Sequence, residues 1–131
     1  MFRHQINLSV EAPIAKQSVE VSFKPAIATE GQVTVHCRYL AQFSGDRIRI
    51  WPSTYLKYKT HKSNLVHVEN ISIYPQWTLV QAGKSFRFSL IFSALPKGCS
   101  SFDLVEEIPE PGGFVYKNIK RNNADVYQIE I

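Results

Sequence analysis

The segment Ser85-Phe86-Arg87-Phe88-Ser89-Leu90-Ile91-Phe92 decides the fold. Its even-numbered residues are large and apolar, while Ser85, Arg87 and Ser89 between them are polar. This alternation is typical of a β-strand with one buried face, because successive side chains of a strand point to opposite faces of the sheet. Ile91 adds an apolar residue to the second face, which predicts that this strand is central.

The same alternation recurs on both sides of this segment. Upstream, Val33, Val35, Cys37 and Tyr39 share one face of the stretch 32–40. Turn signals rich in Gly, Pro, Asn and Asp separate the stretches, and no helical periodicity longer than about one or two turns appears. We expect strands in residues 5–10, 18–24, 32–40, 47–51, 54–59, 64–74, 77–80, 85–92, 102–106, 114–119 and 125–131.

This pattern predicts an all-β protein. Many short strands with turn signals roughly every 8–12 residues are typical of a sandwich or a barrel. A chain of 131 residues fits one domain. We therefore expect a single domain over residues 1–131, folded as an immunoglobulin-like antiparallel β-sandwich of two sheets. A jelly-roll-type sandwich is the alternative.

Three stretches carry a family resemblance: residues 82–92 followed by 95–97 and 102–104, the pair Cys37 and Trp51, and Asp125-Val126-Tyr127. Their order resembles the small immunoglobulin-like domains of bacterial secreted antigens and lipoproteins. The Cys–Trp spacing is similar to that of immunoglobulin domains, and the last stretch resembles their tyrosine-corner strand. No second Cys follows Tyr127, in contrast to that family. The resemblance implies a domain that binds or positions other proteins.

Charge and terminal sequence bear on the compartment. The formal net charge is +4, which is mild for a protein that binds nucleic acid tightly. Residues 1–5 lack the apolar run of a signal peptide, and the longest uncharged apolar run, 88–95, is too short to span a bilayer. We expect a cytoplasmic protein without membrane insertion, or a secreted or periplasmic one if the sequence is a mature form or a fragment.

The sequence provides little for catalysis or metal binding. Cys37 shares its face with Val35 and Tyr39, and His36 points to the opposite face, so we expect a core thiol without a basic neighbour. We expect Cys99 to be exposed in a turn and unpaired with Cys37. His61 and His67 have no metal-ligand spacing. We therefore expect no enzyme activity, no metal and no cofactor.

Carboxylates cluster between residues 103 and 110. Glu106 and Glu107 are adjacent in a strand and should face opposite sides, while Glu110 lies in a Pro-rich loop. A pair of catalytic carboxylates is therefore disfavoured, and we expect an acidic rim.

Two segments are candidate binding sites. The first is the glycine-jointed segment 108–116, because loops on a rigid sheet often carry binding. The second is the basic run 55–62, whose lysines indicate either an exposed edge strand protected from aggregation or a groove for a single-stranded nucleic acid. The candidate binding residues are Pro111, Gly112, Gly113, Phe114, Tyr116, Lys57 and Lys59.

These features favour a non-catalytic module that binds another protein or a second copy of itself. The alternative is a module that binds a carbohydrate or small ligand through Trp51, Tyr55, Tyr74 and Trp77. That alternative requires Tyr74 and Trp77 to line a groove instead of packing in the core. We do not expect nucleic acid as a partner, because the lysine run would have to join Arg47, Arg49 and Arg87 in one patch.

Overall fold

The computed structural model describes residues 10–11, 31–43 and 45–131. The described residues form strands and no helix, which confirms the all-β prediction. The expected strands at 5–10 and 18–24 lie outside the described residues, apart from Val10. The strands are β1 (Val10–Glu11), β2 (Val33–Leu40), β3 (Arg47–Ile48), β4 (Tyr55–Tyr58), β5 (His61–Glu69), β6 (Thr78–Leu79), β7 (Ser85–Phe92), β8 (Ser101–Glu106), β9 (Phe114–Lys120) and β10 (Val126–Glu130).

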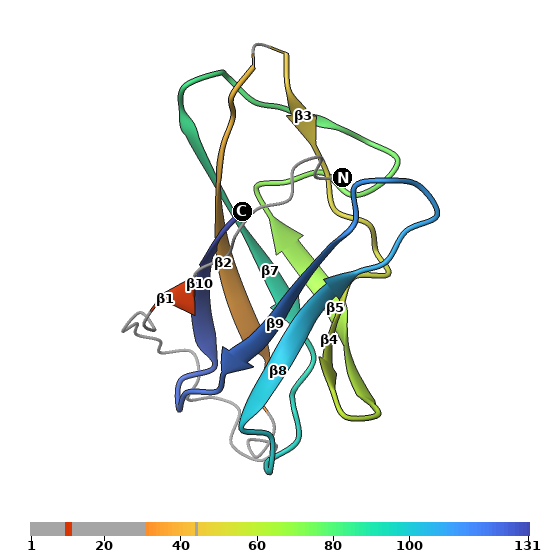
Figure 1. The fold of residues 1–131 in the computed structure, drawn as a ribbon, viewed down its shortest axis with the longest axis vertical. Coiled ribbons are helices and arrows are strands. Elements are labelled where there is room, and N and C mark those ends of the chain that lie inside the picture. The colour runs from red at the N-terminus through yellow and green to blue at the C-terminus, as the bar shows by residue number, and fades with distance from the viewer. Residues whose placement is uncertain (1–9, 12–30, 44) are drawn as a thin grey trace.

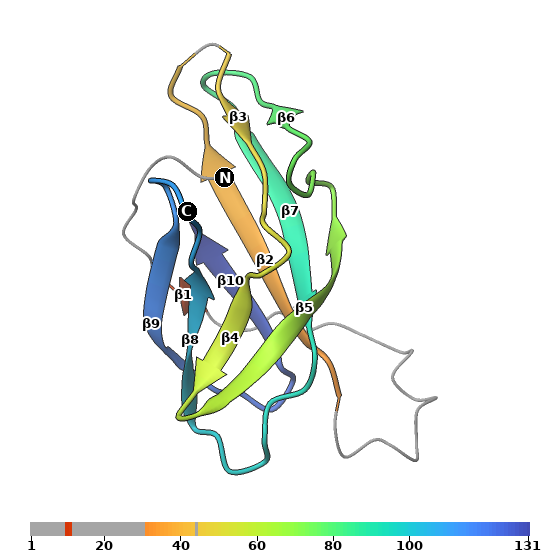
Figure 2. The same cartoon turned by 90° about the vertical axis from the view of Figure 1, so that its right-hand side faces the viewer.

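One curled sheet holds most of these strands. Its order is β1-β10-β2-β7-β5-β4-β8-β9, and β3 pairs with β6 in a second, small sheet. The large sheet folds over so that β8 and β9 face β2 and β10 (Figures 1 and 2). Strand β5 belongs to both layers, because it pairs first with β4 and then with β7. Its pairing with β7 shifts register between Leu65 and His67, and such a bulge bends a strand.

The pairing differs from the expected arrangement in two respects. Both layers come from one continuous sheet, which β5 links, whereas two separate sheets were expected. Strand β10 runs parallel to β2, with Tyr127 opposite Val35, whereas a wholly antiparallel sandwich was predicted. The parallel pair arises because the chain leaves β9 in one layer and crosses to the other layer before it forms β10 (Figure 2). The sheet is therefore mixed.

The core lies between the two layers. Strands β2 and β7 pair over their full lengths and lie inside the sheet, as the apolar second face of β7 predicted. The inward residues of β2, from Val33 to Tyr39, are all buried. Phe102 of β8 meets Tyr127 of β10 edge to face, with ring centroids 5.1 Å apart. This contact joins two strands that are not neighbours in the sheet, and it shows that the layers pack against each other.

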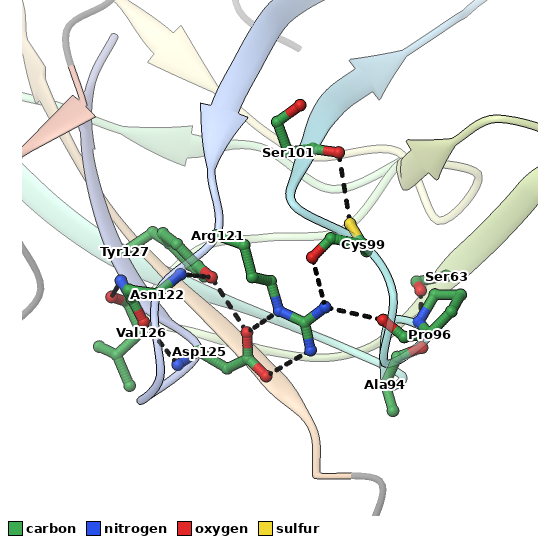
Figure 3. Close-up of polar contacts among 10 residues, drawn as sticks. All are labelled: Ser63, Ala94, Pro96, Cys99, Ser101, Arg121, Asn122, Asp125, Val126 and Tyr127. Atoms are coloured by element: carbon green, nitrogen blue, oxygen red, sulfur yellow. Dashed lines mark hydrogen bonds and ion pairs between the residues drawn. The ribbon is translucent and has the colours of Figure 1, made fainter.

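Arg121 forms hydrogen bonds with two separate segments at the end of the core, where the chain crosses between the layers (Figure 3). Its guanidinium donates two hydrogen bonds to the Asp125 carboxylate, at 2.6 and 3.1 Å. It also donates to the backbone carbonyls of Pro96 and Cys99, at 2.8 and 3.2 Å. The hydrogen bonds with Asp125 raise the pKa of Arg121. One side chain therefore links the turn before β8 to the connection between β9 and β10.

The turn held by Arg121 contains Cys99, which the sequence placed at the surface. Its side chain is instead buried, and its thiol donates a hydrogen bond to the Ser101 carbonyl at 3.3 Å. The Cys99 carbonyl is directed toward Arg121, which leaves the side chain on the inner side of the turn. Cys37 and Cys99 are both free thiols.

We expect Arg121→Ala to lower the free energy of unfolding by about 2–3 kcal/mol, because two carbonyls lose a donor and the partly buried Asp125 carboxylate keeps the Tyr127 hydroxyl but loses its cation. The matched control is Arg38→Ala. Arg38 pairs with Glu130, but the two side chains are 43% and 42% exposed, against 19% and 18% for Arg121 and Asp125. An exposed pair contributes at most about 1 kcal/mol. Urea unfolding followed by tryptophan fluorescence measures both losses, and equal losses would contradict the assigned role of Arg121.

Candidate functional site

Three connections meet at one side of the curled sheet. They are the segment 49–54 that leads into β4, the segment 70–77 between β5 and β6, and the loop 107–113 between β8 and β9. Their side chains surround a single guanidinium group, that of Arg49. We call this group of residues the Arg49 cluster; it comprises Arg49, Trp51, Tyr74, Trp77, Glu106 and Glu110.

The backbone around residue 50 brings two of these segments together. Ile48 and Ile50 are fully buried, so Arg49 between them must point to the opposite side of the chain. Ile50 forms an isolated parallel bridge with Ile73. The Ile50 N–H donates to the Ser72 carbonyl at 3.0 Å, and the Tyr74 N–H donates to the Ile50 carbonyl at 2.9 Å. The aromatic residues that follow Ile73 therefore lie beside Arg49.

The Arg49 side chain is only 8% exposed and lies among aromatic rings. Its guanidinium carbon lies 3.7 Å from the Trp77 ring centroid and 4.6 Å from that of Tyr74. One amino group donates to the Pro75 carbonyl at 2.9 Å, and the other lies 3.6 Å from the Glu110 carboxylate. Because a guanidinium is planar and more weakly hydrated than an ammonium, Arg is suited to this stacked, dry position.

Glu106 supplies a buried acid to the same cluster. It follows Phe102 and Leu104 at intervals of two in β8, so it shares their inward face, and it is 1% exposed. Its Oε2 accepts a hydrogen bond from the backbone N–H of Trp51 at 3.0 Å. Burial raises the pKa of Glu106 to about 7, against the weaker lowering effects of the Trp51 N–H and Arg49. The expected acidic rim is therefore wrong for Glu106, which is an internal acid.

Several polar atoms of the cluster lack partners in the described part of the chain. They are Nε of Arg49, Nε1 of Trp51 and Oε1 of Glu106. Buried polar groups are normally hydrogen-bonded, so three unmatched atoms in one cluster are unusual. These two N–H donors and the carboxyl oxygen are themselves buried. The exposed ring of the cluster is that of Tyr74, a residue that is 38% exposed.

The structure brings together two regions that the sequence named separately. Trp51, Tyr74 and Trp77 were candidate ligand-binding aromatics, and Pro111, Gly112 and Gly113 belonged to the candidate loop. Glu110 of that loop pairs with Arg49, and Arg49 contacts the rings. Tyr74 is exposed, and Trp51 and Trp77 are half-buried. The fourth candidate ring, that of Tyr55, lies outside the cluster and donates through its hydroxyl to Glu107 at 3.4 Å.

The glycines of the loop have distinct structural roles. Gly112 has φ +113°, which favours glycine. A Cβ atom at Gly113 would clash with the backbone oxygen of Glu106, so this glycine lets the loop close onto β8. Phe114 and Tyr116, which we expected at the binding surface, lie instead in the core, where their rings stack with centroids 5.3 Å apart. Their packing in the core holds the start of β9, the strand that follows the loop.

Lys57 and Lys59 are exposed, but β4 is not an edge strand. It pairs with β5 on one side and with β8 on the other. The edge-strand interpretation of the basic run is therefore wrong. Arg49 is buried in its own cluster, and Arg87 projects from β7 in the other layer. The single basic patch required for a nucleic-acid partner does not form.

The outer face of β2 and β7 holds a hollow of about 510 Å³, lined by polar side chains such as His36, Arg87 and Ser89. His36 Nδ1 lies 2.7 Å from the Ser89 hydroxyl. Cys37 points into the core, as predicted, and burial raises the pKa of its thiol. A thiol that stays protonated is a poor nucleophile, so Cys37 and His36 do not form a catalytic pair.

Sequence reasoning missed Arg49 and Glu106. The position of Glu106 carried a signal, because it continues the inward period of Phe102 and Leu104 into the end of a strand. Arg49 carried none, because the two rings on which it packs most closely, those of Tyr74 and Trp77, lie more than twenty residues away in the sequence.

Comparison of the chain with protein-family models, with curated proteins and with solved structures finds no match. The resemblance to immunoglobulin-like domains therefore stays a prediction. Among the described residues, none forms a helix that could span a membrane. The same residues contain no group of three or more His, Cys, Asp or Glu side chains placed to hold a metal ion.

The buried acid predicts a specific pH dependence of stability. Because the pKa of Glu106 is raised from 4.5 to about 7 on folding, the folded protein keeps a proton that the unfolded chain loses between these values. The free energy of unfolding should therefore fall as the pH rises from about 4.5 to about 7, by up to roughly 3 kcal/mol. Glu106→Gln should remove this fall and should be more stable than the wild type above pH 7.

Urea unfolding at a series of pH values measures this effect as the difference between wild type and variant. Glu107→Gln is the matched control, because Glu107 is the exposed neighbour of Glu106 and its loss should leave the slope unchanged. Parallel curves for wild type and Glu106→Gln would disprove the raised pKa.

The stacked guanidinium predicts that charge alone cannot replace Arg49. Arg49→Lys keeps the charge but loses the planar contact with Trp77 and Tyr74, and we expect it to cost about 1–2 kcal/mol. The tryptophan emission should also shift to longer wavelength as the rings gain solvent. The exposed Arg87 provides the control, and Arg87→Lys should cost less than about 0.5 kcal/mol. If both substitutions cost the same, Arg49 has no stacking role.

Proposed function

We propose that the protein is a non-catalytic recognition module with an immunoglobulin-like β-sandwich architecture. In this proposal it binds a protein partner through the 107–113 loop and the exposed part of the Arg49 cluster. The partner contacts the loop directly, and the two layers of the sheet act as a rigid support.

One observation carries this proposal: Arg49, in the segment 49–54, contacts both the segment 70–77 and the loop 107–113, so the three connections lie side by side. The loop 107–113 is anchored at its base by Gly113 against Glu106 and along its length by Glu110 on Arg49. Its exposed residues include Pro109 and Pro111, which restrict the backbone. A loop ordered before binding loses less conformational entropy when a partner docks. Loops on a rigid scaffold are common sites of recognition.

The immunoglobulin-like part of the proposal has support from Tyr127. Its hydroxyl accepts a hydrogen bond from the Asn122 backbone N–H, five residues upstream, at 3.0 Å. A tyrosine corner makes this kind of contact. In immunoglobulin domains the corner precedes the penultimate strand, whereas Tyr127 lies in β10, the last strand of this chain.

A carbohydrate or small polar ligand is the second candidate. The exposed Tyr74 ring and the unmatched atoms of Arg49, Trp51 and Glu106 favour it, because small-ligand sites combine apolar walls with a few convergent polar groups. A protein partner remains our first choice, because the aromatic rings already contact one another and the arginines and so offer less free ring surface to a small ligand. The Trp51 and Tyr74 centroids are 3.9 Å apart, and Arg47 lies 4.6 Å from the Trp77 ring centroid.

The proposal predicts which substitutions weaken binding. Immobilised protein is used to isolate a partner, and the affinity of the purified partner is then measured by calorimetry. We expect the pair Tyr74→Ala and Pro111→Ala to weaken binding by tenfold or more, because contact residues at an interface centre often contribute over 1 kcal/mol each. The control is Val115→Ala, which removes an exposed apolar side chain from β9. Equal losses, or no loss, would refute the assigned surface.

Two further measurements separate the alternatives. Light scattering over a range of concentrations reports whether the partner is a second copy of the chain. Titration with a panel of sugars, followed by tryptophan fluorescence, tests the second candidate. A saturable change that Tyr74→Ala abolishes would favour the small-ligand function over the protein-binding function.

A further inference from the structure

The outer face of β4, β5, β8 and β9 is rich in lysine. Lys57 of β4 lies opposite Lys62 of β5 on one side and opposite Asp103 of β8 on the other. In β9, the register places Lys120 opposite Ser101 and brings Lys117 beside Asp103 at a bulge. We call this surface the lysine face; its lysines are Lys57, Lys62, Lys117 and Lys120 of the strands, together with Lys59 of the turn between β4 and β5, all of them exposed.

The charge of the lysine face is not neutralised within the described part of the chain. No ion pair there involves a lysine. The carboxylates nearby are Asp103, which accepts the Asn118 N–H at 2.9 Å, and Glu107, which accepts the Tyr55 hydroxyl. Five lysines against two carboxylates account for most of the net charge of +4. Like charges directly opposite on neighbouring strands destabilise a sheet, so the Lys57–Lys62 pair is not explained by stability.

The aromatic rings near these lysines distinguish between anionic partners. Tyr55 shares the outer side of β4 with Lys57, and the Lys62 ammonium lies 4.4 Å from the Tyr55 ring centroid, whereas Tyr58 packs against the core. Single-stranded nucleic acids bind by stacking bases on free aromatic faces, and here a lysine already contacts the Tyr55 ring. No arginine from the described residues joins the face to provide the bidentate fork that recognises phosphate. The groups that remain are ammonium groups on the outer face of the sheet, and these can pair with carboxylates as point charges.

We propose that the lysine face binds an acidic segment of a protein, rich in Asp and Glu, in an extended form. Across the sheet, Lys117 of β9, Lys57 of β4 and Lys62 of β5 lie in one row, with Asp103 of β8 between Lys117 and Lys57. Adjacent strands lie about 4.8 Å apart, so an extended acidic chain laid across the strands can reach the neighbouring pair Lys57 and Lys62, and Lys117 beyond Asp103. This surface is separate from the Arg49 cluster and binds independently of it. The module therefore presents two surfaces of different chemistry.

The test uses the full chain and a fluorescent polyglutamate peptide, followed by anisotropy at low ionic strength. Polyglutamine of the same length is the neutral control peptide. We expect the double substitution Lys57→Gln and Lys62→Gln to weaken binding about tenfold, since two exposed charge contacts are lost. The matched control is Lys84→Gln with Arg87→Gln, which removes the same charge elsewhere and should change the affinity less than about threefold.

Each other outcome overturns the proposal. Equal weakening by both double variants would mean that only the net charge acts. No binding of polyglutamate would remove the acidic partner altogether. Tighter binding of a single-stranded oligonucleotide, with the same loss in the Lys57 and Lys62 variant, would assign the face to nucleic acid. The substituted positions are exposed, and the double variant should unfold at an equal or higher urea concentration than the wild type, which shows that any loss of binding does not come from unfolding.

Discussion

The architecture depends on the need of a single sheet to bury its own apolar face. With no helix among the described residues to cover that face, the sheet must fold over and pack against itself. Strand β5 makes this possible, because its first half belongs to one layer and its second half to the other. The register shift between Leu65 and His67 marks the change. The contact of Phe102 with Tyr127, and the arrangement of the connections at the edges of the layers, follow from this fold.

The Arg49 cluster shows how the edge of such a core is organised. Apolar packing ends where the strands end and the connections begin. The backbone N–H and C=O groups and the polar side chains there need hydrogen-bond partners. Arg49 meets this need for the Pro75 carbonyl and the Glu110 carboxylate while its flat surface packs on rings. The nearby Glu106 is not given an equally good partner, so the cost of burying its charge exceeds the attraction of Arg49. The same packing therefore joins the connections through Arg49 and leaves the Glu106 carboxyl group with too few hydrogen-bond partners.

The sequence predicted the parts of the fold that depend on local alternation. The inward faces of β2 and β7, the central place of β7 and the burial of Cys37 all follow from a period of two. Pairing between distant segments leaves no local trace, so the parallel pair of β10 with β2 and the double membership of β5 were missed. The basic composition of β4 suggested an edge strand, but its neighbours β5 and β8 are set by the global topology. In the candidate site, Glu106 followed the period and could have been found. Trp51, Tyr74 and Trp77 were named as candidate aromatics, but their packing on Arg49 depends on long-range pairing such as the bridge between Ile50 and Ile73 and could not be predicted.

The two proposed surfaces differ in the physics by which they would act. The 107–113 loop contacts the rest of the protein through the Glu110–Arg49 pair and the close approach of Gly113 to Glu106, and a loop ordered before binding loses less conformational entropy when a partner docks. The lysines lie on the outer face of the curled sheet and form no ion pair with a carboxylate among the described residues. Their long-range field raises the rate of encounter with an acidic partner more than it strengthens the final complex, and salt screens it. A partner that carries an acidic segment beside a folded surface would use both effects, since binding at one surface raises the effective concentration at the other.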